Sequence, residues 1–134
     1  MIGKNNPFNI RSSANNWIGL AEPRETRGFC NFRLEDYGIR AAAILVMRSY
    51  RRADCLTISE IIHRFAPLKE NNTDAYIDFV CSKLGVFPFD IPKTQWQFSL
   101  LLNAMSIFEG NPVSTNDIYR VVKDFNIKPL CRKM

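Results

Sequence analysis

The sequence predicts one α+β domain that is mainly helical, with about five helices and one small β-hairpin. Two observations underlie this prediction. The chain has 134 residues, of which 46% are hydrophobic and 23% charged, and this balance fits a single globular domain over residues 1–134 with a core of its own. From residue 34 onward apolar residues recur at helical spacing, whereas residues 1–33 are rich in Asn, Gly, Pro and Ser.

The hairpin is expected within the N-terminal third of the chain. Asn5-Asn6-Pro7 disfavours a helix at the start. Two candidate strands follow, Asn16–Ala21 and Gly28–Arg33, and the polar stretch 22–27 is expected to form the loop between them.

The helices are placed by apolar spacing and by the residues that begin or end each one. Thr57 and Glu60 have the spacing of a capping box, Ser114 and Asp117 offer another cap, and Gly85 is a natural helix stop. The five helices are expected over about 34–52, 57–66, 73–84, 94–108 and 118–125, with Gly38 as a weak point in the first.

Composition and charge narrow the function classes. No stretch approaches the ~20 apolar residues of a membrane span, and the first ten residues lack the apolar core of a secretory signal. The four cysteines are far apart and His63 is the one histidine, so we expect reduced thiols, no metal site and no cofactor. The net charge of +5 favours anionic partners. Among anionic partners, nucleic acid has the weakest support, because the basic residues are scattered along the chain.

Glu109 is the candidate for catalysis. It follows an apolar helix directly and precedes the break Gly110-Asn111-Pro112. The C-terminal end of a helix and an apolar setting both favour a protonated carboxyl, which a general acid for glycosidic cleavage requires. On position alone, however, an exposed and solvated glutamate is the better interpretation.

Aromatic residues in the hairpin region are a second feature of interest. Trp17, Phe29 and Phe32 could stack on sugar rings or could pack the hairpin onto the helices. We expect two of the three to belong to the core.

Six segments of the chain form a distinctive series. They are NNPFNIR at 5–11, Trp17, GFCNF at 28–32, YGIRA at 37–41, TISEIIHRFAP at 57–67 and ENNTDAYI at 70–77. This series resembles a family of small phage and prophage proteins that typically read NNPGNIR, W-x-G, F-x-x-F, YGIRA and RWAPPxENxTxxYI. Members are often labelled virion structural proteins, and some resemble peptidoglycan-degrading lysins.

The chain departs from the family pattern at a few positions. Phe8 stands where the family has Gly, and Leu68 replaces a second Pro. The family's final His-Glu-Asn-Gly is matched by Phe108-Glu109-Gly110-Asn111, without the histidine. These departures bear on activity rather than on the fold.

A second resemblance is to lysozyme-like lytic transglycosylases and glucosaminidases. In those enzymes an apolar helix ending in Glu is followed by a small β-region, in some branches by an asparagine-rich segment, and then by further helices. This chain has the same pieces with its Glu-bearing helix near the end, so joining the end to the beginning would restore the order. The resemblance, an analogy at the level of the fold, implies a single lysozyme-like domain that is circularly permuted.

These resemblances imply a phage-type peptidoglycan hydrolase or lytic transglycosylase with Glu109 as its single general acid. Asn6, Asn9, Trp17 and Tyr76 are the implied substrate-binding residues, although turn formation explains the asparagines equally well. The only candidates for a second acid, Glu22 and Glu25, lie in the expected hairpin loop, where acidic residues are usually just solvated.

The alternative is a non-catalytic virion or mobile-element structural protein of the same fold, so whether the chain is an enzyme stays open. The implied partners are bacterial peptidoglycan and other virion proteins. We expect synthesis in the bacterial cytoplasm without a signal peptide, followed by association with the virion or release to the cell wall.

Overall fold

The computed structural model describes residues 1–68 and 71–131. An irregular N-terminal segment leads into an antiparallel hairpin of β1 (Leu20–Thr26) and β2 (Phe29–Phe32). A long helix follows, built from α1 (Glu35–Ile44), one π-helical turn η1 (Leu45–Ser49) and α2 (Tyr50–Arg52). The remaining helices are α3 (Ile58–Phe65), α4 (Thr73–Leu84), α5 (Gln95–Phe108) and α6 (Thr115–Asp124). For the described residues, the predicted mainly helical α+β architecture with five helices and one hairpin is confirmed.

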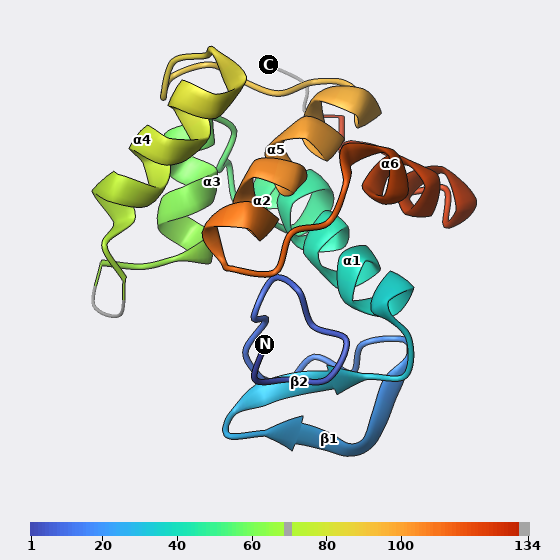
Figure 1. Cartoon of the computed structure of the whole chain (residues 1–134). Helices are drawn as coiled ribbons and strands as arrows, with labels where there is room; N and C mark the ends of the chain where they lie inside the picture. The colour runs from blue at the N-terminus through green and yellow to red at the C-terminus, as the bar shows by residue number, and fades with distance from the viewer. Residues whose placement is uncertain (69–70, 132–134) are drawn as a thin grey trace.

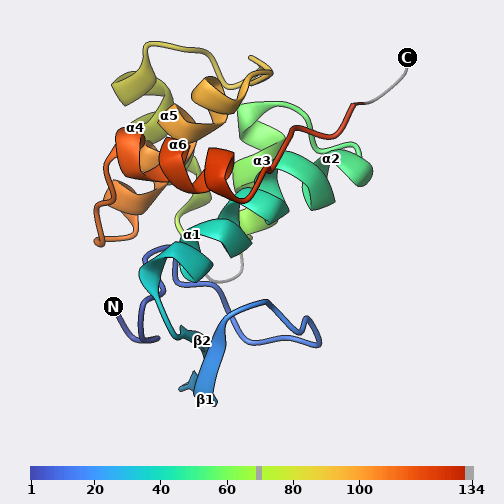
Figure 2. The ribbon, with the colours of Figure 1, turned by 90° about the vertical axis from the view of Figure 1, so that its right-hand side faces the viewer.

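Helix α5 is the centre of the helical part of the molecule. It packs against α4 and α6, while α3 packs against α4 and α1 packs against α6 (Figure 1). The hairpin lies at the end of the molecule away from the α4–α5 connection, and the N-terminal segment lies between the hairpin and the helices (Figures 1 and 2).

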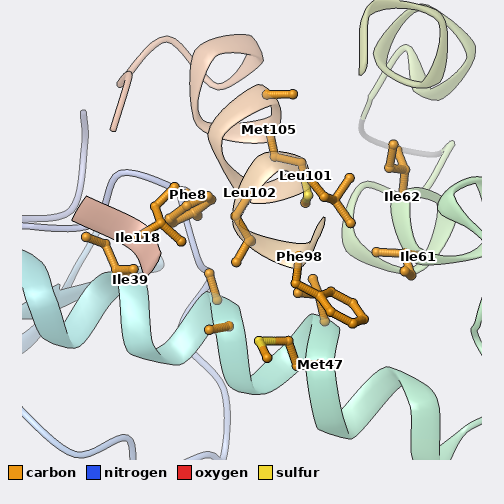
Figure 3. Packing of buried hydrophobic residues seen from close by; sticks show 14 of the residues in the cluster. Phe8, Ile39, Met47, Ile61, Ile62, Phe98, Leu101, Leu102, Met105 and Ile118 are labelled. Atoms are coloured by element: carbon orange, nitrogen blue, oxygen red, sulfur yellow. The ribbon is translucent and has the colours of Figure 1, made fainter. Parts of the chain in front are cut away.

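The core forms around the apolar face of α5. Phe98, Leu101, Leu102 and Met105 of this helix are fully buried. They face Ile39 and Met47 of the first helix, Ile61 and Ile62 of α3, Ile118 of α6 and Phe8 of the N-terminal segment (Figure 3). The helices and the N-terminal segment therefore share one hydrophobic core.

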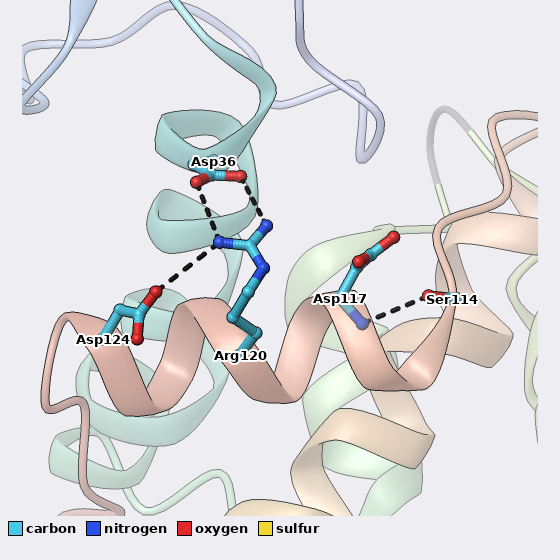
Figure 4. A network of polar contacts seen from close by, with 5 residues as sticks. All are labelled: Asp36, Ser114, Asp117, Arg120 and Asp124. Atoms are coloured by element: carbon cyan, nitrogen blue, oxygen red, sulfur yellow. Dashed lines mark hydrogen bonds and ion pairs between the residues drawn. The ribbon is translucent and has the colours of Figure 1, made fainter.

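Helix ends follow the expected capping chemistry. Thr57 and Glu60 form the predicted capping box at α3, and Gly85 ends α4 in the left-handed conformation (φ 67°). The Ser114 hydroxyl accepts the amide of Asp117 at 3.1 Å, so α6 begins at Thr115, three residues before the predicted start (Figure 4). The cap therefore, rather than the first apolar residue, determines where α6 begins.

Packing against the N-terminal segment explains why glycine stands at position 38, the predicted weak point of the first helix. A β-carbon at this position would collide with the backbone carbonyl oxygen of Asn5. Glycine therefore allows the N-terminal segment to lie directly on α1.

The hairpin differs from its prediction. Residues 22–26, expected in the loop, belong to β1, and the turn is Arg27-Gly28, whose φ angles are 52° and 82°. Two consecutive left-handed residues make a tight two-residue turn. The expected strand 16–21 overlaps β1 only at Leu20 and Ala21, because most of β1 is exposed and its residues show no apolar alternation.

The N-terminal segment runs along the other edge of β2. The amide of Cys30 donates to the Ile10 carbonyl at 2.9 Å, and the amide of Phe32 donates to the Lys4 carbonyl at 2.8 Å. Arg11 and Phe29 form an isolated antiparallel bridge. The segment is thereby held as a partial third strand, which places residues 9–11 beside the helices.

A surface ion-pair network links the first and last helices. Arg120 of α6 contacts Asp36 of α1 at 3.1 Å and Asp124 of its own helix at 3.5 Å (Figure 4). These groups are exposed, so the network contributes little to stability compared with the core. None of the helices in the described residues has the length and apolar character needed to cross a membrane.

Candidate functional site

A cleft of about 570 Å³ lies where the N-terminal segment, the hairpin, α3 and the end of α5 meet. Glu109, Asn9 and Trp17 line it, three residues that the sequence analysis had singled out. Other lining residues include Arg11, Phe29, Tyr50, Arg64 and Asn111. The cleft thus combines amides, aromatic rings, two guanidinium groups and one carboxylate.

Glu109 is the residue that caps the C-terminal end of α5. Its amide donates to the Met105 carbonyl at 2.9 Å, and its side chain is half-buried. Asn9 Nδ2 donates to Glu109 Oε1 at 2.9 Å and lies 3.3 Å from the Glu109 carbonyl oxygen. An amide from a segment 100 residues away therefore holds one carboxylate oxygen in place.

The backbone around Asn9 explains how its amide reaches Glu109. Asn9 adopts a left-handed conformation with φ 52°, which asparagine tolerates better than most residues. Its two neighbours, Phe8 and Ile10, are buried in the core. Asn111 Nδ2 also donates to the Pro7 carbonyl at 3.2 Å, which ties the loop after α5 to the same segment.

Asn6 lies beneath the cleft and is completely buried. Its Nδ2 donates to the carbonyls of Ile10 at 2.9 Å and Cys30 at 3.0 Å, and its Oδ1 accepts the Ile10 amide at 2.9 Å. Asn6 is outside the cleft lining, and its side chain joins the N-terminal segment to β2.

Tyr76 is also buried and lies outside the cleft lining. Its ring stacks on Phe108 with centroids 4.2 Å apart, and its hydroxyl donates to the Met105 carbonyl at 3.4 Å. Burial raises the pKa of the Tyr76 phenol well above its usual range, and the nearby Glu109 carboxylate raises it further. Tyr76 therefore keeps its proton at neutral pH and can donate it in a hydrogen bond, as it does to the Met105 carbonyl.

The three hairpin-region aromatics lie in different environments. Phe32 is fully buried, whereas Trp17 is partly buried and packs against the core. Phe29 lines the cleft, with the Arg11 guanidinium carbon 4.8 Å from its ring centroid. Trp17 also lines the cleft, and its indole Nε1 is buried without a hydrogen-bond partner in the structure.

The two alternative acids are remote from this arrangement. Glu22 and Glu25 are both exposed on β1 and do not line the cleft. Among the described lining residues, Glu109 is the one carboxylate. No cluster of three or more His, Cys, Asp or Glu side chains suited to a metal ion occurs within 1–68 and 71–131.

Arg11 and Arg64 are the site residues that sequence reasoning missed. Arg11 lies in the segment 5–11 and Arg64 in the segment 57–67 of the distinctive series. The apolar spacing of α3 indicates which of its residues are buried but gives no role to Arg64. Their position in the cleft depends on how α3 and β2 are packed, which local spacing does not reveal.

Comparison with known proteins places the chain among phage proteins. No protein-family model matches the sequence. Over 123 residues the chain is 32% identical to protein P5 of Pseudoalteromonas phage PM2, a match that covers 87% of this chain and 76% of that protein. Because the match extends over most of both chains, the protein belongs to the same family of phage proteins as P5 of phage PM2.

Proposed function

We propose that this phage protein cleaves the glycan strands of bacterial peptidoglycan, as a hydrolase or lytic transglycosylase, with Glu109 as the single general acid. The observation that carries the proposal is the Glu109 carboxyl in a cleft of about 570 Å³, with Asn9 Nδ2 2.9 Å from its Oε1. A cleft of this volume is within the usual range for small-ligand sites, about 300–1,000 Å³.

In the proposed reaction, protonated Glu109 donates its proton to the glycosidic oxygen as the bond to that oxygen breaks. Because Asn9 Nδ2 donates to Glu109 Oε1, the proton to be transferred is assigned to Glu109 Oε2. Once the proton has left, the Asn9 amide stabilises the new carboxylate through a charge-assisted hydrogen bond.

The second step needs no other carboxylate in this mechanism. The N-acetyl oxygen of the substrate's own sugar attacks the anomeric carbon and stabilises its positive charge. Glu109 then takes a proton from the incoming nucleophile. Water as nucleophile gives hydrolysis, whereas the sugar's own C6 hydroxyl gives a 1,6-anhydro end.

The other cleft residues have supporting roles in the proposal. Trp17 and Phe29 offer aromatic surfaces for sugar rings. Asn9 is a positioning residue, and Tyr76 supports the end of α5 from behind through the Met105 carbonyl. Asn6 acts indirectly, by fixing the segment that carries Asn9.

The test is the clearing of purified sacculi by the full chain and by Glu109→Gln. Glutamine keeps the shape and the hydrogen bond from Asn9 but cannot donate the proton, so we expect clearing to fall by on the order of 10²–10⁴-fold or more. Glu25→Gln, which removes an exposed carboxylate from β1, is the matched control and should clear like the wild type. Analysis of the products for anhydro-sugar or reducing ends separates transglycosylase from hydrolase.

The second candidate is a non-catalytic component of the virion. The replacement by Phe108 of the histidine typical of the phage and prophage family that the chain resembles favours it. It predicts that the wild type clears no sacculi of any wall type, and that the protein co-purifies with phage particles. Equal clearing by wild type and Glu109→Gln would instead remove Glu109 from the mechanism.

A further inference from the structure

We propose that Arg64 makes the Glu109 cleft a binding site for carboxylate groups, so that its ligand is an acidic, peptide-bearing glycan rather than a neutral amino-sugar polymer. The inference rests on the proposed function, because it names the substrate class of the same cleft. It concerns binding, however, and can be tested without cleavage.

Arg64 lies in the last turn of α3 and lines the same cleft as Glu109. Its guanidinium carbon is 5.9 Å from the ring centroid of Tyr50, which also lines the cleft. An arginine over an aromatic face keeps the N–H groups at the edge of its guanidinium plane for other partners. The side chain is exposed, and none of the described carboxylates forms an ion pair with it.

The charge of the cleft supports an anionic ligand. Its described lining holds two guanidinium groups, those of Arg64 and Arg11, and the single carboxylate of Glu109. A general acid is neutral in the form that donates its proton, so among the described lining residues the charged side chains of the working cleft are the guanidinium groups. Low local dielectric in a partly enclosed site strengthens the attraction for an anion.

Arginine also selects among anions by geometry. Its planar fork of N–H donors matches the two oxygens of a carboxylate. Peptidoglycan strands carry carboxylates in the peptide stems on every second sugar, whereas a polymer of N-acetylglucosamine carries none. Arg64 is therefore expected to distinguish the two through the peptide-bearing sugar.

The alternative explanation is that Arg64 serves only α3, because a cation in the last turn complements the helix dipole. A purely structural role would change stability without changing ligand choice. The experiment therefore compares two ligands that differ only in their carboxylates.

Binding is measured by titration calorimetry with the full chain carrying Glu109→Gln, which prevents turnover. The first probe is the N-acetylglucosamine–N-acetylmuramic acid disaccharide with its tetrapeptide. The second is the same molecule with its carboxylates converted to amides. We expect the acidic probe to bind about tenfold or more tightly than the amidated one, and added salt to weaken this preference.

Adding Arg64→Gln should lower the affinity for the acidic probe by about tenfold and leave the affinity for the amidated probe unchanged. Lys83→Gln is the matched control, because it removes one positive charge from an exposed position on α4 outside the cleft. Equal affinity for both probes in the Glu109→Gln protein that retains Arg64 would overturn the inference. An equal loss of affinity for both probes on adding Arg64→Gln would also overturn it.

The outcomes also separate this inference from the proposed function. If wild type clears sacculi but Arg64→Gln binds both probes as before, the enzyme proposal stands and the carboxylate site fails. If wild type clears nothing yet binds the acidic probe in an Arg64-dependent manner, the carboxylate site stands and the catalytic proposal fails.

Discussion

Asn6 and Asn9 belong to one short motif, yet their side chains do different things. Asn6 is buried and makes three hydrogen bonds to backbone groups of Ile10 and Cys30. Asn9, three residues later, points its amide to Glu109. Both asparagines support the cleft, one by holding the segment and the other by contact with the candidate acid.

Asn6→Ala is expected to destabilise the fold strongly. It removes all three hydrogen bonds and leaves buried backbone groups without partners, which should lower the free energy of unfolding by roughly 2–4 kcal/mol. Urea unfolding followed by circular dichroism measures this. Asn15→Ala is the control, because Asn15 is exposed and its hydrogen bonds come from its backbone. A loss of under about 0.5 kcal/mol for Asn6→Ala would contradict a structural role.

At the scale of elements, the N-terminus of α3 combines two kinds of stabilisation. The amide of Glu60 donates to the Thr57 hydroxyl at 3.1 Å, and the amides of Thr57 and Leu56 donate to Glu60 Oε1 at 3.0 and 3.1 Å. Because these backbone donors favour the ionised carboxylate, they lower the pKa of Glu60 below its ordinary value of 4.5.

This shift predicts a pH dependence of stability. Because the folded pKa of Glu60 lies below the unfolded one, the stabilisation is complete above pH 4.5 and is lost as the pH falls through the folded pKa. Glu60→Gln keeps an acceptor oxygen but does not titrate in this range. The stability advantage of wild type over Glu60→Gln should therefore shrink between about pH 7 and about pH 3. An advantage that stays constant across this range would show that the cap has no charge component.

The whole molecule depends on contacts between distant parts of the chain. The N-terminal segment contributes Phe8 and Ile10 to the same core that α5 and α6 build with Leu102 and Ile118. The cleft forms only because this segment lies between the hairpin and the end of α5. A shared core predicts that both ends of the molecule unfold together.

Two tryptophans allow that prediction to be checked. Trp17 lies in the cleft beside the hairpin, and Trp96 lies at the start of α5 in edge-to-face contact with Tyr119 at 5.1 Å. Trp17→Phe and Trp96→Phe each leave one fluorescent probe. Within each variant, the denaturant midpoint from fluorescence should match that from circular dichroism. An earlier midpoint at Trp17 would mean that the hairpin and N-terminal segment unfold as a separate unit.

The helices could be predicted from local sequence, because apolar spacing and capping residues act within a few positions along the chain. Thr57, Gly85 and Ser114 each mark a helix end in the structure. The register of β1 was decided by pairing with β2, since an exposed strand has no apolar alternation to reveal it.

The candidate site divides in the same way. Glu109, Asn9 and Trp17 were singled out from the sequence, and all three line one cleft. Tertiary structure alone separated Asn9 from buried Asn6 and brought Arg64 to the same cleft. The physical reason is that a side chain's partners depend on packing between segments as much as 100 residues apart, which local sequence spacing does not specify.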